Sequence, residues 1–222
     1  DRRATIDKYM GDCIMAFWNA PVNVDEHEKQ AVESALEMVD RLDELNVELE
    51  GEGKMPIKIG IGINTGEVVV GNMGSNNRFD YSILGDAANL ASRLEGQSKG
   101  YGVTIILGEE TATAVDNELF NIELDKIAVK GKKDAIRIFT VLGNNDWVFK
   151  NTNWYFNQQQ HDKFLVLYRQ QSWESAELFA NDLRASWPEM AGYYGVMIDR
   201  IREYKENPPG DSWDGVYRAE TK

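Results

Sequence analysis

Three side chains in this sequence have types and spacings that could act on a phosphorylated substrate. Asp12 follows Gly11 at a tight turn, where a carboxylate can reach a divalent cation. Asn89 and Arg93 are spaced i, i+4, so a helix places both on one face, and the planar guanidinium suits a phosphate. Spacing alone still favours plainer interpretations: Gly-Asp is ordinary turn chemistry, and an arginine on an amphipathic helix usually faces solvent.

The elements that must position these residues alternate between strand and helix patterns. Two β-prone runs, 5–10 and 13–18, meet at Gly11-Asp12 and predict a hairpin. A second hairpin is predicted from 57–63 and 67–71, joined at Asn64-Thr65-Gly66. Apolar periodicity predicts helices over 25–50 and 85–97, a short helix over 109–115, and strands over 103–107, 119–124 and 136–142. Hairpins mixed with helices indicate an α+β layer fold, with the sheet covered on one face.

Composition changes near residue 143 and predicts two units. Most of the glycine precedes this point, and five of the six tryptophans follow it. We interpret 1–143 as one unit of strands and helices, and 144–222 as an α-helical C-terminal extension. Within the extension, apolar residues follow helical spacing along two stripes: Trp173, Ala176, Phe179, Ala180 and Leu183, then Met190, Tyr194, Met197, Ile201 and Tyr204.

The overall composition excludes several classes of protein. A single cysteine, Cys13, excludes a disulfide scaffold and a multi-cysteine metal site, and two distant histidines make no ligand pair. The formal net charge of −13 disfavours a nucleic-acid binder, but an enzyme of nucleotides remains possible because a metal ion can supply positive charge. No apolar run in the sequence approaches the roughly 20 residues that a membrane-spanning helix needs.

Four segments, in this order, resemble the class III adenylate and guanylate cyclases. Residues 5–18 (TIDKYMGDCIMAFW) resemble the metal-binding hairpin of that family, and 59–71 (IGIGINTGEVVVG) resemble its next hairpin. Residues 78–95 (RFDYSILGDAANLASRLE) resemble its transition-state segment, and 129–132 (VKGK) its triphosphate lysine loop. The resemblance covers about residues 4–142. It implies the class III nucleotide cyclase fold, an α+β fold in which helices cover a ferredoxin-like sheet.

The resemblance also implies roles for the chemical residues. Asp12 becomes a ligand of two Mg²⁺ ions (or Mn²⁺), which serve in-line attack on the α-phosphate of ATP. Arg93 stabilises the transition state, and Asn89 orients the ribose or its attacking 3′-oxygen.

Three further residues bind substrate in this interpretation. Lys8 reads adenine, although without the resemblance an edge-strand lysine that blocks aggregation is the better interpretation. Ser82 occupies the second purine-reading position, where Asp or Thr is commoner, and it keeps the hydroxyl of Thr. Lys130, beside Gly131, holds the terminal phosphates.

In the family two such domains pair head to tail and share their sites. We therefore expect a homodimer in which one protomer gives Asp12 and the other gives Lys8, Ser82, Asn89, Arg93 and Lys130. The family's other metal aspartate lies on an upstream strand, in a motif resembling F-x-D-[IL]-x-x-[FY]-T that these 222 residues do not contain. We accordingly expect residues 1–222 alone to have little activity.

The C-terminal tail adds an expectation about location. Its Y-R-x-x-x-W-x-x-A and P-P-x-D-x-W-D-G patterns resemble bacterial cyclases with an N-terminal CHASE-type sensor. The implied arrangement is a cytoplasmic catalytic domain in a parent protein that an upstream region anchors in the bacterial inner membrane. Two alternatives stay open: a non-catalytic cyclase-like module for regulation or dimerisation, and a guanylate cyclase.

Overall fold

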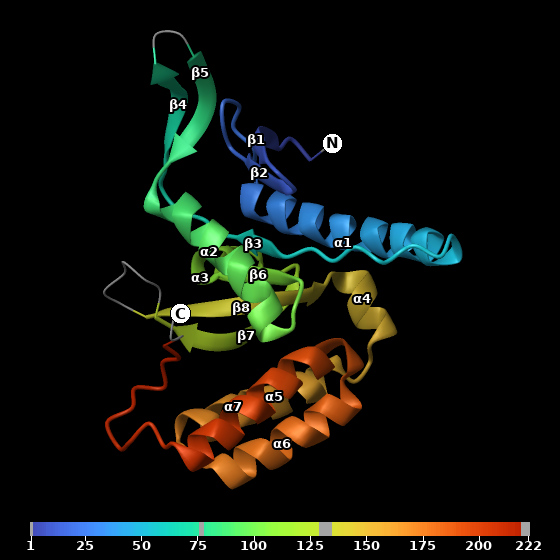
Figure 1. Ribbon diagram of the computed structural model, residues 1–222, viewed down its shortest axis with the longest axis vertical. Helices are drawn as coiled ribbons and strands as arrows, with labels where there is room; N and C mark the ends of the chain where they lie inside the picture. The colour runs from blue at the N-terminus through green and yellow to red at the C-terminus, as the bar shows by residue number, and fades with distance from the viewer. Residues whose placement is uncertain (1, 76–77, 129–134, 219–222) are drawn as a thin grey trace.

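A computed structural model describes residues 2–75, 78–128 and 135–218 of the chain (Figure 1). Its central sheet has four strands in the order β3-β6-β8-β7, with these bounds: β3 (Ile61–Ile63), β6 (Ile105–Gly108), β8 (Ile136–Gly143) and β7 (Phe120–Ile127). β3 and β6 run parallel, whereas β8 is antiparallel to both β6 and β7. This sheet is the platform on which the helices and two hairpins are placed.

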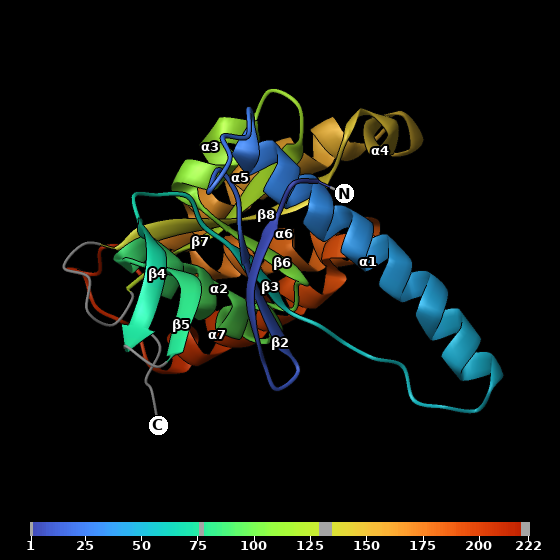
Figure 2. The same cartoon turned by 90° about the horizontal axis from the view of Figure 1, so that it is seen from above.

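Both faces of the central sheet are covered, which corrects the expectation of a single covered face. Alternate residues of β6 enter different cores, since Ile106 packs with α2 (Asp86–Tyr101) and Leu107 packs with α1 (His27–Gly51) and α3 (Glu109–Val115). All four β6 residues are buried, as expected of a strand covered on both faces. Figure 2 shows α1 running out past the edge of the sheet.

Two hairpins lie beside the sheet rather than within it. β1 (Thr5–Met10) and β2 (Cys13–Phe17) pair antiparallel, with Met10 opposite Cys13 at the tip, which confirms the predicted first hairpin. β4 (Val69–Ser75) and β5 (Arg78–Leu84) form a long antiparallel arm that projects from the body (Figure 1).

The predicted second hairpin is wrong, because β3 and β4 do not pair. β4 pairs instead with β5, which follows after only two residues, and the short connection makes this pairing cheap in loop entropy. β3 joins β6 and packs under α2 at very close range. A Cβ at Gly62 would come within 2.2 Å of the Ala91 backbone oxygen, so glycine is required for this approach.

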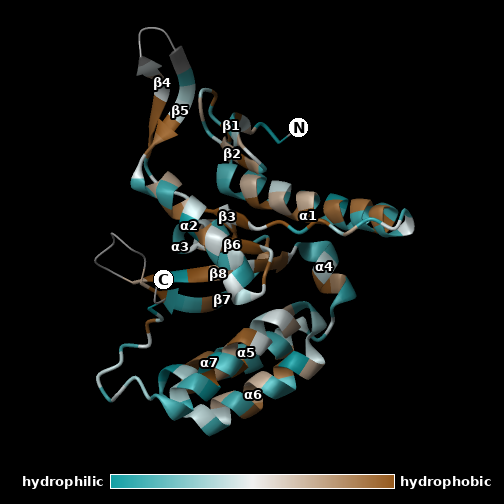
Figure 3. Ribbon diagram, viewed as in Figure 1, coloured by the Kyte–Doolittle hydropathy of each residue, from teal (hydrophilic) through white to brown (hydrophobic). Residues whose placement is uncertain are grey.

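The C-terminal part is helical as predicted. It consists of α4 (Asn145–Lys150), α5 (Trp154–Arg169), α6 (Trp173–Ser186), the 3₁₀ turn η1 (Pro188–Met190) and α7 (Ala191–Glu206). Helices α5 to α7 share one hydrophobic core with α2 and the sheet, and the brown bands of Figure 3 mark the apolar residues of these elements. None of the helices in the described ranges is long and apolar enough to cross a bilayer.

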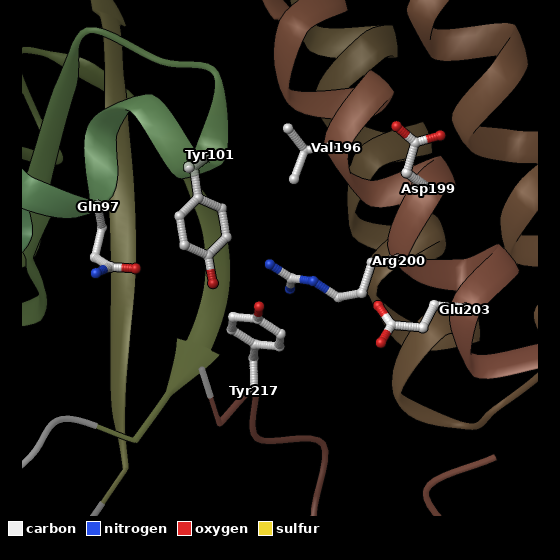
Figure 4. A pocket seen from close by; sticks show the side chains of 8 residues that line it. Gln97, Tyr101, Val196, Asp199, Arg200, Glu203 and Tyr217 are labelled. Carbon is white, nitrogen blue, oxygen red and sulfur yellow. The ribbon is translucent and has the colours of Figure 1, made fainter. Parts of the chain in front are cut away.

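A buried charge pair fastens α7 to the sheet. Arg200 donates to Asp125 of β7 at 2.5 Å, and the two side chains are 7% and 0% exposed. The Tyr101 hydroxyl donates to the same carboxylate at 2.7 Å, and the Arg200 guanidinium lies 3.5 Å from the centre of the Tyr217 ring. Tyr101, Arg200 and Tyr217 line a pocket of about 260 Å³ between α2 and α7 (Figure 4). Because its buried charges already satisfy one another, we interpret this pocket as a structural joint.

A buried histidine makes the stability of this helical layer depend on pH. The Nε2 of His161 lies 2.6 Å from the Glu123 carbonyl, and its Nδ1 lies 2.8 Å from the Tyr194 hydroxyl. A neutral ring satisfies both bonds by donating to the carbonyl and accepting from the hydroxyl. Burial lowers the pKa of His161 from 6.5 to about 4.

Acid is therefore expected to destabilise the chain through His161. Only the unfolded state binds the proton between pH 6.5 and about 4, so stability is full above pH 6.5 and falls across this window. The loss attributable to His161 is at most about 3 kcal/mol. Urea unfolding at several pH values, compared with His161→Gln, measures it. The variant should show a shallower fall over the same window, and equal falls would contradict this assignment.

Candidate active site

The structure brings Lys8 and Ser82 together from segments far apart in the sequence. Lys8 lies on β1 and Ser82 on β5, and the Lys8 ammonium donates to the Ser82 hydroxyl oxygen at 3.3 Å. The Phe17 and Tyr81 rings, 6.1 Å apart, form a second contact between the two hairpins. The Lys8 side chain is 40% exposed, so its ammonium can meet a ligand from solvent.

A third residue completes this group, and sequence reasoning did not identify it. Asp7 precedes Lys8, and its side chain is wholly buried. Its Oδ2 accepts a hydrogen bond from the Ser82 hydroxyl at 2.8 Å, and its Oδ1 lies 3.5 Å from the Lys8 ammonium. Alternation along β1 does not identify Asp7, because the register shifts between Ile6 and Lys8 and the burial of the strand does not alternate.

Asn89 and Arg93 lie on the helix that directly follows the strand of Ser82. β5 ends at Leu84, Gly85 caps the helix, and α2 begins at Asp86. Both side chains are exposed on the first half of α2, one turn apart. The continuous β5–α2 unit thus carries one base-reading candidate and two phosphate- or ribose-binding candidates.

Asp12 lies at the exposed tip of the β1–β2 hairpin, beside Gly11 in a left-handed conformation (φ +65°). Within the described ranges, no three His, Cys, Asp or Glu side chains cluster closely enough to hold a metal ion. A single exposed carboxylate still fits part of a magnesium site, because Mg²⁺ takes one or two carboxylates and completes its shell with substrate phosphates. Lys130 lies outside the described residues.

A larger hollow of about 750 Å³ lies at the start of α2 but is poorly suited to a triphosphate. Four carboxylates contribute to its lining: Glu67, Asp86, Glu109 and Glu110. Like charges would repel a polyphosphate there. The geometry therefore favours the Lys8–Ser82 group and the exposed face of α2 as the candidate site.

Comparison with known sequences gives a family for this arrangement. Residues 5–143 match the adenylate and guanylate cyclase catalytic domain. The chain is 41% identical over 143 residues to an adenylate cyclase of Anabaena cylindrica, covering 61% of this chain and 28% of that protein. It is 36% identical over 140 residues to adenylate cyclase 1 of Rhizobium meliloti (strain 1021), covering 63% and 21%. The chain therefore spans less than a third of the length of these relatives.

Solved structures share the fold. The adenylyl cyclase CyaB from P. aeruginosa superimposes with a TM-score of 0.61 at 33% identity, covering 65% of this chain and 74% of that one. The guanylyl cyclase Cya2 gives a TM-score of 0.58 at 36% identity, covering 65% and 73%. These matches confirm the expected class III cyclase fold, with a helical part after it in this chain.

Proposed function

The chain belongs to the family of adenylate and guanylate cyclase catalytic domains, and from this premise we propose that it converts ATP to cyclic AMP and pyrophosphate. The contact between Lys8 and Ser82 is the observation that supports ATP as the substrate. An ammonium donor suits the N1 acceptor of adenine, and a hydroxyl oxygen beside it suits the N6 amino donor. Guanine presents the reverse pattern at these two atoms.

In the proposed reaction, some residues of the chain bind the substrate and others stabilise the charge that develops on it. The ribose 3′-oxygen forms a bond to the α-phosphorus, and the 3′-hydroxyl proton passes to solvent water. The bond from that phosphorus to the oxygen that bridges the α- and β-phosphates breaks, and pyrophosphate leaves with the electron pair. Asn89 holds the ribose, Arg93 offsets the charge that develops at the phosphorus, and Lys130 holds the leaving pyrophosphate. Asp12 is the ligand that this chain offers to two Mg²⁺ or Mn²⁺ ions, which supply Lewis acidity when bound.

We propose that the active form is a head-to-tail homodimer. The base of the β4–β5 arm is strongly apolar (Figure 3), and its cross-strand pair Val69 and Leu84 is 69% and 63% exposed. The neighbouring β1–β2 hairpin also exposes large apolar side chains: Ile6, Tyr9, Met10 and Ile14. Apolar surface of this kind favours a second protein surface over water, and a second copy fits the proposed sharing of sites.

Two other functions would use the same fold. A guanylate cyclase is favoured by the similarity to Cya2, but the donor and acceptor arrangement of Lys8 and Ser82 opposes it. A non-catalytic dimerisation module is favoured by the metal-binding side of the site, since no group of three His, Cys, Asp or Glu side chains in the described ranges could hold a metal ion. The resemblance of the C-terminal tail supports a parent protein that is anchored in the membrane, carries an upstream sensor and acts in signal transduction. Fractionation of the full-length gene product would test the membrane anchoring.

Exchanging the base-reading pair tests the proposed substrate. The full-length gene product should form cyclic AMP from ATP faster than cyclic GMP from GTP, measured with Mn²⁺ at equal nucleotide concentrations. Lys8→Glu combined with Ser82→Cys should shift this ratio toward GTP, because a carboxylate accepts from the guanine N1–H where the ammonium donated to adenine. A wild-type protein that already prefers GTP would overturn the assignment.

A further inference from the structure

One oxygen of the Asp7 carboxylate is buried without a hydrogen bond from any described residue, and the packing of the fold does not explain why. The Asp7 side chain is 0% exposed, and in the described part of the chain its Oδ1 accepts no hydrogen bond. A buried carboxylate oxygen left in this way is costly, so such a group calls for an explanation. The explanation lies in what Asp7 does to its two neighbours.

Asp7 settles the direction of the Ser82 hydroxyl proton. A hydroxyl has one hydrogen to donate and two lone pairs to accept with. The hydrogen of Ser82 is committed to Asp7 Oδ2 at 2.8 Å, and one lone pair takes the Lys8 hydrogen bond at 3.3 Å. Toward any ligand, Ser82 therefore has only an acceptor left.

Asp7 also holds the Lys8 ammonium group in position. Its Oδ1 lies 3.5 Å from the Lys8 ammonium, which has three hydrogens and no acceptor. One hydrogen is directed to Ser82, and the negative charge of Asp7 holds the ammonium beside it. At least one hydrogen remains for a ligand on the exposed side of Lys8.

We propose that Asp7 is a positioning residue for base selection, which fixes Lys8 as a donor and Ser82 as an acceptor so that the pair accepts adenine and rejects guanine. The proposal rests on the proposed function and deepens it. A serine or threonine hydroxyl can by itself serve either as donor or as acceptor, so it discriminates poorly between the adenine amino group and the guanine O6. With its hydrogen held by Asp7, the Ser82 oxygen would face guanine O6 as a second acceptor.

The decisive variant is Asp7→Ala in the full-length gene product. It frees the Ser82 hydroxyl to donate, so the ratio of kcat/KM for ATP to that for GTP should fall by about tenfold, the effect of one hydrogen bond. Ser82→Ala should lower the ratio similarly, and the loss in the double variant should be smaller than the sum of the two single losses, because part of the effect of Asp7 passes through Ser82. Asp7→Asn keeps an acceptor oxygen and should retain more of the ratio.

Asp80→Ala is the matched control, since that carboxylate is exposed on the same strand as Ser82, two residues earlier. It should leave the ratio unchanged. A purely structural role for Asp7 would lower turnover with both nucleotides and leave their ratio as in the wild type, and that result would overturn the proposal.

Equilibrium binding of ATP and GTP separates this proposal from the proposed function. If the protein binds ATP more tightly than GTP but forms no cyclic nucleotide, the cyclase assignment fails, and the role of Asp7 is judged from the ratio of dissociation constants. If the wild-type protein prefers ATP in neither binding nor turnover, the role of Asp7 is rejected. Loss of the ATP preference in Asp7→Ala, with thermal unfolding showing a folded protein, supports it.

Discussion

Replacing Arg93 by alanine in the full-length gene product is expected to lower cyclic AMP formation by about a hundredfold or more. Arg93 is exposed on α2, one turn after Asn89, where its fork of donors can follow the charge on the phosphate oxygens. Arg93→Lys keeps the charge but loses the fork, so it should recover only part of the rate. Lys99→Ala, an exposed cation in the last turn of the same helix, should keep full activity.

Asp12→Ala is expected to be comparably inactive, because it removes the carboxylate that the hairpin tip offers to the metal ions. Asp12 is exposed and has no packing role, so unfolding curves of the variant should match the wild type. Cys13→Ser changes the next exposed side chain and should leave turnover near normal. Substantial cyclic AMP formation by either Asp12→Ala or Arg93→Ala would overturn the role proposed for that residue.

The largest expected effect on stability comes from Arg200→Met. The change leaves the carboxylate of Asp125 buried without its cation, which should lower the free energy of unfolding by about 3–5 kcal/mol. Urea unfolding of the chain measures the loss. The double change Asp125→Leu with Arg200→Met removes both charges and should recover part of it.

Arg41→Ala provides the comparison at the surface. Arg41 pairs with Glu44 at 3.0 Å, but both side chains are mostly exposed, at 72% and 67%. Water screens such a pair, so its removal should not change stability measurably. A loss below about 1 kcal/mol for Arg200→Met would mean that the joint between α7 and β7 is not held by this charge pair.

Features with a local cause could be predicted from the sequence. The hairpin at Gly11-Asp12 was predictable because one short turn joins two β-prone runs, and the structure confirms β1 and β2 there. The short helix over Glu109–Val115 and the α-helical character of 154–204 are likewise confirmed. In each case the apolar period and a nearby turn suffice, without knowledge of distant partners.

Features that depend on distant contacts were not predictable in the same way. The partner of β3 is β6, and this parallel pairing leaves no turn signature between them. The mixture of hairpins and helices predicted one covered face, although the unbroken apolar run at 105–107 fits a strand buried on both sides.

The candidate site shows the same limit. Lys8 and Ser82 were identified from motifs, but their contact depends on how β1 and β5 meet, which no local pattern specifies. Asp7 was missed because its partner Ser82 lies 75 residues further along the chain. A carboxylate beside a lysine on a strand resembles an ordinary surface pair until the fold shows it buried.

In the proposed dimer, each site that cyclises ATP takes Asp12 from one copy of the chain and Arg93 from the other. Mixing the inactive variants Asp12→Ala and Arg93→Ala of the full-length gene product, and measuring cyclic AMP formation, tests this claim most directly. Random pairing makes half of the dimers mixed, and each mixed dimer keeps one site with both residues intact, so roughly a quarter of wild-type activity should return. No return of activity, with subunit exchange confirmed separately, would place Asp12 and Arg93 in one protomer's site and contradict the claim.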